Sequence, residues 1–526
     1  MNLLTIDFET YYAQDYGLRK LTTEEYIRDP RFEVIGVAVK QNNEPTVHYS
    51  GDEIGTFKFL KSFDWDNSVA IAHNARFDMA ILNWRFQIKP KKIVDTLGMA
   101  RAIHGTEVGG SLKALVEHYK LGAKGTEIVQ ALGLKRLDFS PKQLAEYMMY
   151  CENDVNLTYD LFRCLIKDFP KTELDLIDLT TRMFTEPVIE LEKQVLTDHI
   201  LDVQLRKQEL LNSVTDSLAD LRSNPKFADL LRSHGVEPPM KTSLTTGKET
   251  YAFAKTDEDF KELLEHPNEY VRTLVEVRMG VRSSIEETRT ERFIGIAERG
   301  TLPVPLRYYA AHTGRWGGDD KINMQNLKRD SKLKYAMRAP KGYKFVDCDL
   351  AQIEARMLAY LAEQEDLVEA FDKGDDVYTI MASNIYSKAQ EDIDKGERFV
   401  GKMTILGCGY GMGAVRFQEQ LKAFHVEIED DESVEIIGVY RSTYSAIPAL
   451  WAQAGQAIEA ILDDKSFVFG RDDLIVVDGV EGIRLPNGLY LKYPNLRKEY
   501  SEEDGRYEYW YDQRRGRSVI PTRIYG

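Results

Sequence analysis

Several features that mark particular protein classes are missing from this sequence. Its four cysteines form no CxxC pair, so neither a zinc site nor a disulfide framework is predicted, and a reducing, cytoplasmic setting is expected. No stretch approaches the ~20 apolar residues that span a bilayer, and the N-terminus shows no signal peptide. With 43% hydrophobic and 29% charged residues, the 526-residue chain is typical of a globular protein with three or four domains.

An excess of positive charge is also missing. The net charge of −16 argues against a protein that binds nucleic acid through its whole surface, because phosphate contacts need Lys and Arg. The net charge does not exclude nucleic-acid binding, because binding depends on where the 69 basic residues lie. Carboxylates that hold magnesium also add to the negative charge without opposing such binding. The glycine-rich run GCGYGMG is not followed by GK[ST], which disfavours a P-loop.

The first 165 residues alternate short apolar segments with helical ones, which is an α/β pattern. A helix is expected from Pro141 to about Leu165, because Ser140 is a good N-cap and proline suits the first turn. Further elements are expected as strands at Leu3–Phe8, Phe32–Val39, Thr46–Ser50 and Val69–His73, and as a helix from about Phe77.

The remaining chain divides into a helical part and a mixed part. From about Lys171 to Glu298 the segments are charged and amphipathic with no good strand, interrupted by Pro238–Pro239 and Lys241–Glu249. Beyond Thr301 we expect a strand at Tyr343–Leu350, helices over about 352–370 and 376–464, and short strands in the last sixty residues.

Three arginines of the helical part, Arg278, Arg282 and Arg289, are predicted to share one helical face. A solvated face balanced by neighbouring glutamates is favoured there over a face that follows phosphates.

A first acidic constellation lies in the N-terminal third. Asp7 and Glu9 are two apart on a predicted strand and share its face, and Tyr150 and Asp154 are four apart on a predicted helix. With Asp78 they supply four carboxylates and a hydroxyl, as required by hydrolysis with two magnesium ions ~3.5–4 Å apart. The strand pattern of Asp7 and Glu9 and the helix pattern of Tyr150 and Asp154 are each common by chance. Together with the segment of Asp78 between them, in this order, they indicate phosphoryl chemistry on nucleic acid.

A second constellation lies beyond the midpoint. Asp349, at the end of the expected strand, is suited to ligate magnesium that bridges a triphosphate. Arg398, Lys402 and Leu406 recur every four residues and line one helical face, which would place two cations against the triphosphate. Lys402 would protonate the departing pyrophosphate. Without the flanking motifs, a solvated helix face would be the preferred interpretation.

The motifs LTIDFET, HNARFD and YCENDV, in this order, resemble those of the DEDDy family of 3′–5′ exonucleases, which have an RNase H-like fold. The resemblance implies that Asp7, Glu9 and Asp154 hold one metal and that Asp7 bridges to a second, which Asp78 assists through water. Tyr150 would align the attacking water. Asn74 and Phe77 complete the second motif as DNA contacts, and Asp95 fits the family's sheet.

The motifs HTGRWGG, NMQNL, DCDLAQIEAR and RFVGKMTILGCGYGMG resemble family A DNA polymerases, most nearly the bacteriophage type. The implied roles place Glu354 against the sugar 2′ position, Tyr410 near the nascent base, Arg398 and Lys402 on the triphosphate, and Arg315 and Gln325 in the minor groove. Leu406 stands where the family usually has Phe or Tyr, which puts sugar discrimination there in doubt.

The expected architecture is α/β and α+β multidomain, with an RNase H-like exonuclease followed by a helical thumb and a right-hand palm and fingers. The expected boundaries are 1–168 for the exonuclease, 169–300 for the thumb, 301–365 for the first part of the palm, 366–470 for the fingers and 471–526 for palm-associated strands. Implied cofactors are Mg²⁺ or Mn²⁺, two ions at each site, and implied partners are primer–template DNA and deoxynucleoside triphosphates.

One family element is missing. The sequence has no His-Asp-Glu hairpin, where family A enzymes place another metal-binding carboxylate, and Asp347 has no family precedent as a substitute for it. We therefore expect a shortened chain, or a second polypeptide that supplies the remaining palm. Three interpretations stay open: a polymerase with proofreading, a 3′–5′ exonuclease whose polymerase-like part only binds DNA, and a non-catalytic subunit of a split polymerase.

Overall fold

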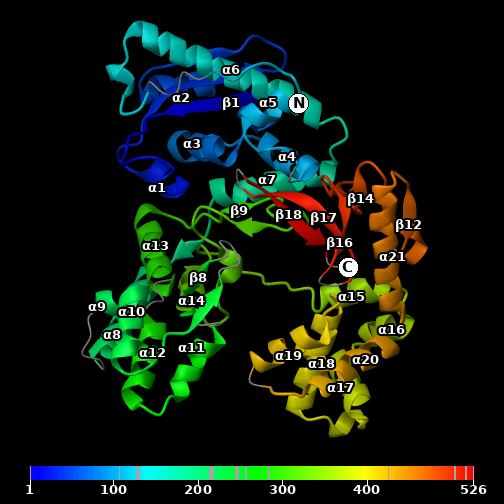
Figure 1. The fold of residues 1–526 in the computed structure, drawn as a ribbon. Coiled ribbons are helices and arrows are strands. Elements are labelled where there is room, and N and C mark those ends of the chain that lie inside the picture. The colour runs from blue at the N-terminus through cyan, green and yellow to red at the C-terminus, as the bar shows by residue number, and fades with distance from the viewer. Residues whose placement is uncertain are drawn as a thin grey trace.

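The computed structural model describes residues 2–105, 107–125, 131–212, 218–242, 248–254, 257–281, 285–424, 426–502, 505–515 and 518–524. An N-terminal domain, blue to cyan in Figure 1, lies above two helical arms. The green arm follows it in sequence, and the yellow to orange arm lies opposite. The C-terminal strands, in red, return to the junction below the N-terminal domain.

The N-terminal domain is built on a five-stranded sheet with the order β3-β2-β1-β4-β5. Its central strand β1 is antiparallel to β2 and parallel to β4. The strands are β1 (Asn2–Thr10), β2 (Val34–Gln41), β3 (Val47–Tyr49), β4 (Ser68–Ala72) and β5 (Lys92–Asp95). The four strands expected here are therefore all present; β1, β2 and β4 are mostly buried, whereas the short edge strand β3 is exposed to half-buried.

Helices cover the sheet and complete its cores. Helix α6 spans Pro141–Leu165 as predicted, and Ser140 and Gln143 form a reciprocal capping box at its start. It packs against β1 and β2, while α3 and α7 lie together beside β1 and β5. The other helices of the domain are α1 (Thr23–Arg28), α2 (Glu53–Lys61), α3 (Arg76–Phe86), α4 (Thr96–His104), α5 (Leu112–His118) and α7 (Lys171–Thr185).

The green arm is helical around a small core that includes Phe227, Phe253 and Phe260. Its helices are α8 (Lys193–Asn212), α9 (Leu218–Arg222), α10 (Asn224–Ser233), α11 (Glu258–Glu262), α12 (Glu269–Val281) and α13 (Ile285–Arg299). The expectation of no strand here is wrong. The short strands β7 (Met240–Thr242) and β8 (Glu249–Tyr251) pair with each other, and β6 (Glu190–Leu191) pairs with β11 (Met337–Arg338). Strands of two or three residues are too short to produce a period in the sequence.

The prediction that three arginines share one solvated helical face is also wrong in part. The Arg278 side chain is 1% exposed and lies over the rings of Phe227 and Phe253, at 4.7 and 5.5 Å. Its guanidinium donates to the carbonyl of Leu221 and to Asn224, so it serves the core of the arm rather than a solvated face. Arg289 belongs to the next helix, because α12 ends at Val281, and Arg282 lies outside the described residues.

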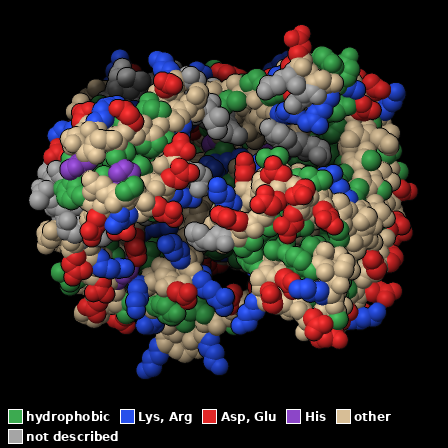
Figure 2. Space-filling view, turned by 60° about the horizontal axis from the view of Figure 1, so that its bottom comes forward, with side chains coloured by type: hydrophobic (Ala, Val, Ile, Leu, Met, Phe, Trp, Pro, Cys, Tyr) green, Lys and Arg blue, Asp and Glu red, His purple; other side chains and the backbone are tan. Residues whose placement is uncertain are grey.

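The second arm contains the predicted helical block. Its core joins α15 to α20 through buried side chains such as Met381, Val400, Phe417 and Tyr440. The helices are α15 (Ile353–Leu361), α16 (Glu365–Lys373), α17 (Val377–Tyr386), α18 (Lys395–Cys408), α19 (Ala414–Lys422), α20 (Asp430–Thr443) and α21 (Ala446–Leu462). Figure 2 shows the two arms from below, with a hollow between them and Asp and Glu gathered on the face of this second arm.

Short strands and turns connect and complete these parts, as expected for the last sixty residues. The pair β9 (Leu306–Arg307) and β10 (Gly317–Gly318) follows the green arm in sequence, and α14 (Lys332–Ala336) packs against α8 within that arm. A four-stranded and a three-stranded sheet follow, formed by β12 (Phe467–Phe469), β13 (Ile475–Asp478), β14 (Gly482–Arg484), β15 (Tyr490–Leu491), β16 (Arg497–Ser501), β17 (Arg506–Arg515) and β18 (Ser518–Ile524).

The strand expected at Tyr343–Leu350 is not formed. Residues 341–350 are all exposed and belong to no helix or strand, and Figure 1 shows the chain running alone from the green arm to α15 here. Its apolar side chains face solvent, with Tyr343 76%, Val346 89% and Leu350 68% exposed. The β propensity is real, but a strand needs a neighbour for its N–H and C=O groups, and no described strand pairs with this one. The shared strand face predicted for Asp347 and Asp349 is therefore absent as well.

Polar contacts attach the N-terminal domain to the rest of the chain. Arg299 at the end of α13 donates through two nitrogens to Glu24 of α1, at 2.9 and 2.7 Å. Trp316 donates to the Thr180 hydroxyl at 3.0 Å, and Asn487 donates to Glu173 at 3.1 Å. All four cysteines are free, and none of the described helices is long and apolar enough to cross a membrane.

Candidate active sites

The first predicted site assembles where β1 extends beyond its neighbour β4. The pairing of these strands ends at Thr5 with Ile71, so the following residues of β1 have one open edge. Helix α3 begins there, and Asp78 in its first turn accepts the amide N–H of Phe8 at 3.1 Å. This bond brings the Asp78 carboxylate, which is 3% exposed, next to the strand that carries Asp7 and Glu9.

A second carboxylate, Asp95, supports the turn before α3. Its Oδ1 atom accepts the amide N–H groups of Asn74 at 2.8 Å and Ala75 at 3.2 Å, and it also caps α4. Asn74 has a φ of 66°, in the left-handed region that asparagine tolerates better than most residues. Asp95 therefore holds the turn that directs α3, and with it Asp78, toward β1.

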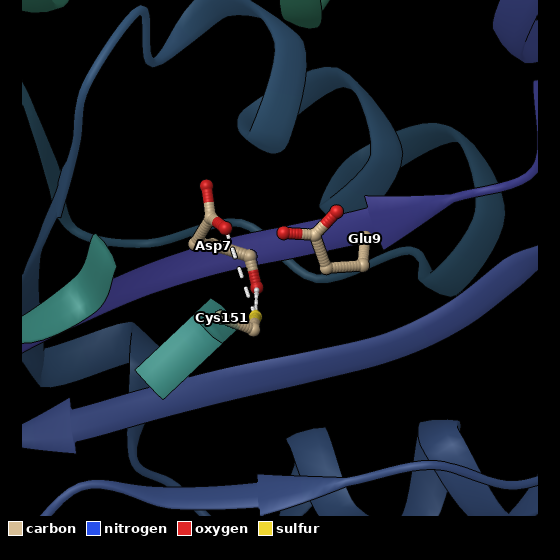
Figure 3. A group of neighbouring side chains, drawn as sticks. All are labelled: Asp7, Glu9 and Cys151. Carbon is tan, nitrogen blue, oxygen red and sulfur yellow. Dashed lines mark hydrogen bonds between the residues drawn. The ribbon is translucent and has the colours of Figure 1, made fainter. Parts of the chain in front are cut away.

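Helix α6 supplies the opposite wall of the site. Tyr147, Tyr150, Cys151 and Asp154 follow the helical repeat and are buried on the face that packs against β1. The Tyr147 hydroxyl donates to Glu9 Oε2 at 2.6 Å, and the Cys151 thiol donates to the Asp7 carbonyl and carboxylate at 3.5 and 3.6 Å. Figure 3 shows Asp7 and Glu9 side by side on β1, with Cys151 below them.

Electrostatic repulsion dominates this cluster. Burial, and then the neighbouring Asp154, raises the pKa of Asp7 to about 7. Burial and Asp7 raise the pKa of Glu9 and of Asp78 well above their usual range. Buried carboxylates that repel one another strain the site unless a cation enters, which is the electrostatic signature of a functional centre.

The nearest described cation is Lys124, in the loop after α5. Its Nζ atom lies 2.6 Å from Asp154 Oδ2 and 5.4 Å from the centre of the Tyr150 ring. It also lowers the pKa of Asp7 and Glu9, so one ammonium group partly offsets the charge of three carboxylates. Asp154 is 5% exposed, and the pair is therefore largely desolvated.

The donor atoms suit a hard divalent cation. Ligand atoms of Asp7, Glu9 and Cys151 lie within 4.8 Å of one another, while Asp154 raises the pKa of Asp7 and Asp7 raises the pKa of Asp78. Burial and the adjacent carboxylates raise the pKa of the Cys151 thiol, so it stays protonated and positions Asp7 instead of binding metal. Carboxylate oxygens remain as ligands, which magnesium and manganese prefer.

Three residues of this site were not predicted from the sequence: Tyr147, Cys151 and Lys124. Tyr147 and Cys151 were accessible in principle, because Tyr147 precedes Tyr150 and Cys151 precedes Asp154 by three residues on the same helix. Lys124 had no such signal, since its loop carries no periodicity. Phe77, expected as a DNA contact, packs 6.0 Å from the Tyr26 ring.

The second predicted site is only partly assembled. Arg398, Lys402 and Leu406 lie on α18 as expected. Arg398, however, donates to both carboxylate oxygens of Asp376, at 2.6 and 3.2 Å, and its charge is already matched. No ion pair joins Lys402 to another described residue. Arg315 donates to Glu354 at 3.1 Å, and both lie near Tyr410, whose pKa is raised by burial and by Glu354 and lowered by Arg315. Gln325, by contrast, is exposed in a short 3₁₀ turn and contacts none of these residues.

Asp349 does not join these residues. It lies in the exposed segment before α15 and makes no hydrogen bond or ion pair with any residue that the structure describes. The structure thus brings together the exonuclease motifs but leaves the predicted polymerase carboxylate apart from the α18 cations.

Comparison with known proteins defines the class. The family model for DNA polymerase family A matches residues 198–465, about half of the chain, and the model for the 3′-5′ exonuclease matches residues 22–169. The chain therefore belongs to DNA polymerase family A and carries a 3′–5′ exonuclease domain before its polymerase domain. The predicted fold class, family and enzyme class are confirmed.

Its similar proteins include polymerases of a phage and of bacteria. The DNA polymerase of Bacillus phage SP02 is 22% identical over 96% of this chain and 84% of its own length. DNA polymerase I of Pseudomonas aeruginosa is 25% identical over 79% of this chain, which spans 48% of that protein. A solved structure, the POL domain of Pol1 from M. smegmatis in complex with DNA primer-template and dNTP, matches with a TM-score of 0.57 at 18% identity, covering 89% of this chain and 77% of that one. Its likeness concerns the fold.

Proposed function

We propose that the N-terminal domain removes nucleotides from the 3′ end of a DNA strand. The observation that carries this proposal is the buried cluster of Asp7, Glu9, Asp78 and Asp154 around the end of β1. Family A polymerase and exonuclease domains generally depend on metal ions. These four carboxylates would hold two magnesium ions, which neutralise charge on the phosphate and on the attacking and departing oxygens.

The remaining residues position this chemistry. Tyr147 and Cys151 hold Glu9 and Asp7 by hydrogen bonds, so the two carboxylates keep their orientation despite their repulsion. Burial and then Asp154 raise the pKa of the Tyr150 hydroxyl, which therefore stays a neutral donor that orients the attacking water. Lys124, next to Asp154, would contact the negatively charged phosphate side of the site.

A reciprocal pair of variants tests the exonuclease proposal. Asp7→Ala should abolish degradation of a 3′-labelled strand with magnesium while binding of that strand in EDTA is retained. Asp349→Ala, an exposed position of the other domain, should leave degradation unchanged. Persistent degradation by Asp7→Ala would show that another group performs the reaction.

For the polymerase domain we propose that Asp349 ligates magnesium, Arg398 and Lys402 bind the triphosphate, and Lys402 protonates the pyrophosphate. Glu354 would exclude the 2′ hydroxyl, Leu406 and Tyr410 would contact the incoming nucleotide, and Arg315 and Gln325 the minor groove of primer–template DNA. Asn74 and Phe77 would contact the strand in the exonuclease. The expected boundaries, 1–168, 169–300, 301–365, 366–470 and 471–526, are retained as our division of the chain, and a bacterial cytoplasm as its location.

The polymerase site requires one further strand beside residues 343–350. These residues have a strand sequence, exposed apolar side chains and no described partner strand. We infer that a further palm segment, from a longer chain or a second polypeptide, pairs here and brings a second carboxylate to Asp349. This chain alone should extend a primer far more slowly than with that segment added. Extension by the chain alone at a rate normal for the family would refute the inference.

A second candidate is a 3′–5′ exonuclease whose polymerase-like part only binds DNA. The exposed Asp349 and the pairing of Arg398 with Asp376 favour it. The test is Asp349→Ala in a primer-extension reaction supplied with the missing segment. Loss of extension supports a catalytic polymerase, whereas no extension even by the unaltered protein supports the binding role.

A further inference from the structure

A cationic cavity lies where the exonuclease domain meets the C-terminal sheet. Its volume is about 600 Å³, within the range of cavities that hold small ligands. Its walls come from α4, from β9 with the loop after it, and from the end of β17, which Figure 1 shows meeting at this junction. Three arginines line it: Arg101, Arg307 and Arg514, with His312 beside them.

The charge of this cavity is opposite to that of the chain. No Asp or Glu is among the described residues that line it, although the whole sequence has 85 acidic against 69 basic residues. A larger cavity, of about 1000 Å³ between α8, α13 and α14, mixes its lysines and arginines with Asp202, Glu209, Glu286 and Asp330. Because no described carboxylate lines the first cavity, its arginines are better placed to bind an external anion.

Two of the three arginines have unused donors. The Nε atoms of Arg307 and Arg514 are buried, and neither has a hydrogen-bond partner among the residues that the structure describes. A buried N–H group without an acceptor costs free energy, and a phosphate oxygen would satisfy it with a charge-assisted bond. Burial lowers the pKa of Arg101, Asp95 partly offsets this, and the adjacent Arg307 lowers the pKa further, so a bound anion would also relieve repulsion between the two guanidinium groups.

The cavity is connected to the exonuclease site through shared residues. Arg101 and Arg307 also line a small pocket that contains Asn74 and Asp95, at the turn that leads to Asp78. Gly110 on the cavity wall accepts a hydrogen bond from His73, which directly precedes Asn74. An anion held here would therefore lie close to the turn behind the acidic cluster, on the side that faces the polymerase domain.

We propose that Arg101, Arg307 and Arg514 bind backbone phosphates of the single DNA strand whose 3′ end enters the exonuclease site. The inference rests on the proposed exonuclease function and adds a second point of attachment for its substrate. A single strand fits because its successive phosphates reach from a reactive site to a neighbouring cationic surface, whereas base identity is irrelevant to guanidinium groups.

The experiment compares the double variant Arg307→Gln/Arg514→Gln with the control Lys58→Gln/Lys61→Gln, which removes the same charge from the exposed surface of α2. Binding of a fluorescent oligothymidylate in EDTA is measured by anisotropy across a range of salt concentrations. The arginine variant should weaken binding about tenfold and reduce the slope of log Kd against log salt by about 1.4, since each single-strand phosphate contact contributes about 0.7. The control should change neither quantity.

Further arms separate the alternatives. Hydrolysis of the p-nitrophenyl ester of thymidine 5′-monophosphate, which is too short to reach both sites, should be unchanged in the arginine variant and lost in Asp7→Ala. Unchanged oligothymidylate binding by the arginine variant would overturn the proposal. If the variant instead lost binding only to free thymidine 5′-monophosphate, the proposal would also fall, and the cavity would be a product site. If the double variant does not fold, Arg514→Gln and the charge-retaining Arg514→Lys provide the same comparison. Arg514→Gln should reduce the slope of log Kd against log salt by about half as much as the double variant, and Arg514→Lys should restore the slope of the unaltered protein. Degradation by Asp7→Ala would instead contradict the exonuclease function itself.

Discussion

The two halves of this molecule carry equally clear motifs but differ in how far their sites are assembled. In the exonuclease domain, β1, α3 and α6 converge, and hydrogen bonds from Phe8, Tyr147 and Cys151 hold three carboxylates together. In the polymerase domain, Asp349 lies on an exposed segment and Arg398 is paired with Asp376. A motif therefore specifies which side chains are present, whereas a site forms only when every element that carries them has its packing partner.

The largest expected difference between the halves is in amide hydrogen exchange. The amides of β1 lie in a central, buried strand and should exchange only through opening of the domain, on the order of 10³-fold or more slower than an unprotected peptide. Amides of residues 343–350 should exchange almost as fast as an unprotected peptide. Mass spectrometry of peptic fragments measures both. Strong protection of residues 343–350 in the isolated chain would contradict their description as an unpaired strand.

The second difference concerns pH in the absence of metal. The pKa of Asp7 is raised from its ordinary value of 3.8 to about 7, so the folded protein binds a proton that the unfolded chain releases. The contribution of Asp7 to stability in EDTA should therefore fall as pH rises from 3.8 to about 7, by about 1.4 kcal/mol for each pH unit, and stay constant at higher pH. Asp7→Asn should flatten the fall, as measured by urea unfolding at several pH values.

The control for this experiment is Asp175→Asn. A hydrogen bond from Lys92 lowers the pKa of Asp175, so its removal should not flatten the fall. Equal pH profiles for the unaltered protein and Asp7→Asn would show that the carboxylates of the cluster are not strained.

A third comparison concerns Lys124 as the internal cation of the exonuclease site. Lys124→Met should destabilise the metal-free protein by about 1–3 kcal/mol, because Asp154 is left buried beside other carboxylates. Saturating manganese should remove most of this loss, since the metal neutralises the same charge. Urea unfolding with and without manganese measures both values, and Lys113→Met, at an exposed position of α5, is the control. A loss that manganese does not reduce would assign Lys124 a purely structural role.

The smallest effect is expected in the polymerase half. The pair between Arg398 and Asp376 is nearly half exposed, at 45% and 42% of the two side chains, and Asp376→Asn should change stability by less than about 1 kcal/mol. The same change frees Arg398 and should tighten binding of a fluorescent deoxynucleoside triphosphate a few-fold. Asp372→Asn, on α16, serves as the control. Weaker nucleotide binding by Asp376→Asn would indicate that the pair positions Arg398 productively.

Much of the exonuclease site could be predicted from local pattern. The N-cap Ser140 and the repeat of Tyr150 and Asp154 specify α6 and its face, and the alternation around Asp7 and Glu9 specifies β1. These signals are reliable because spacing along a helix or strand fixes which side chains share a face. Lys124 could not be predicted, since its approach to Asp154 depends on where a loop without periodicity crosses the sheet.

Local patterns in the sequence specify α6, the helices of the second arm and the order of the motifs, because these depend on contacts between residues close in the chain. Only the tertiary structure decided that Arg278 is buried, that Arg101, Arg307 and Arg514 meet in one cavity, and that residues 343–350 remain unpaired. The reason is physical: hydrogen bonds within a helix are local, whereas a strand or a charged side chain takes its state from partners that are distant in the sequence.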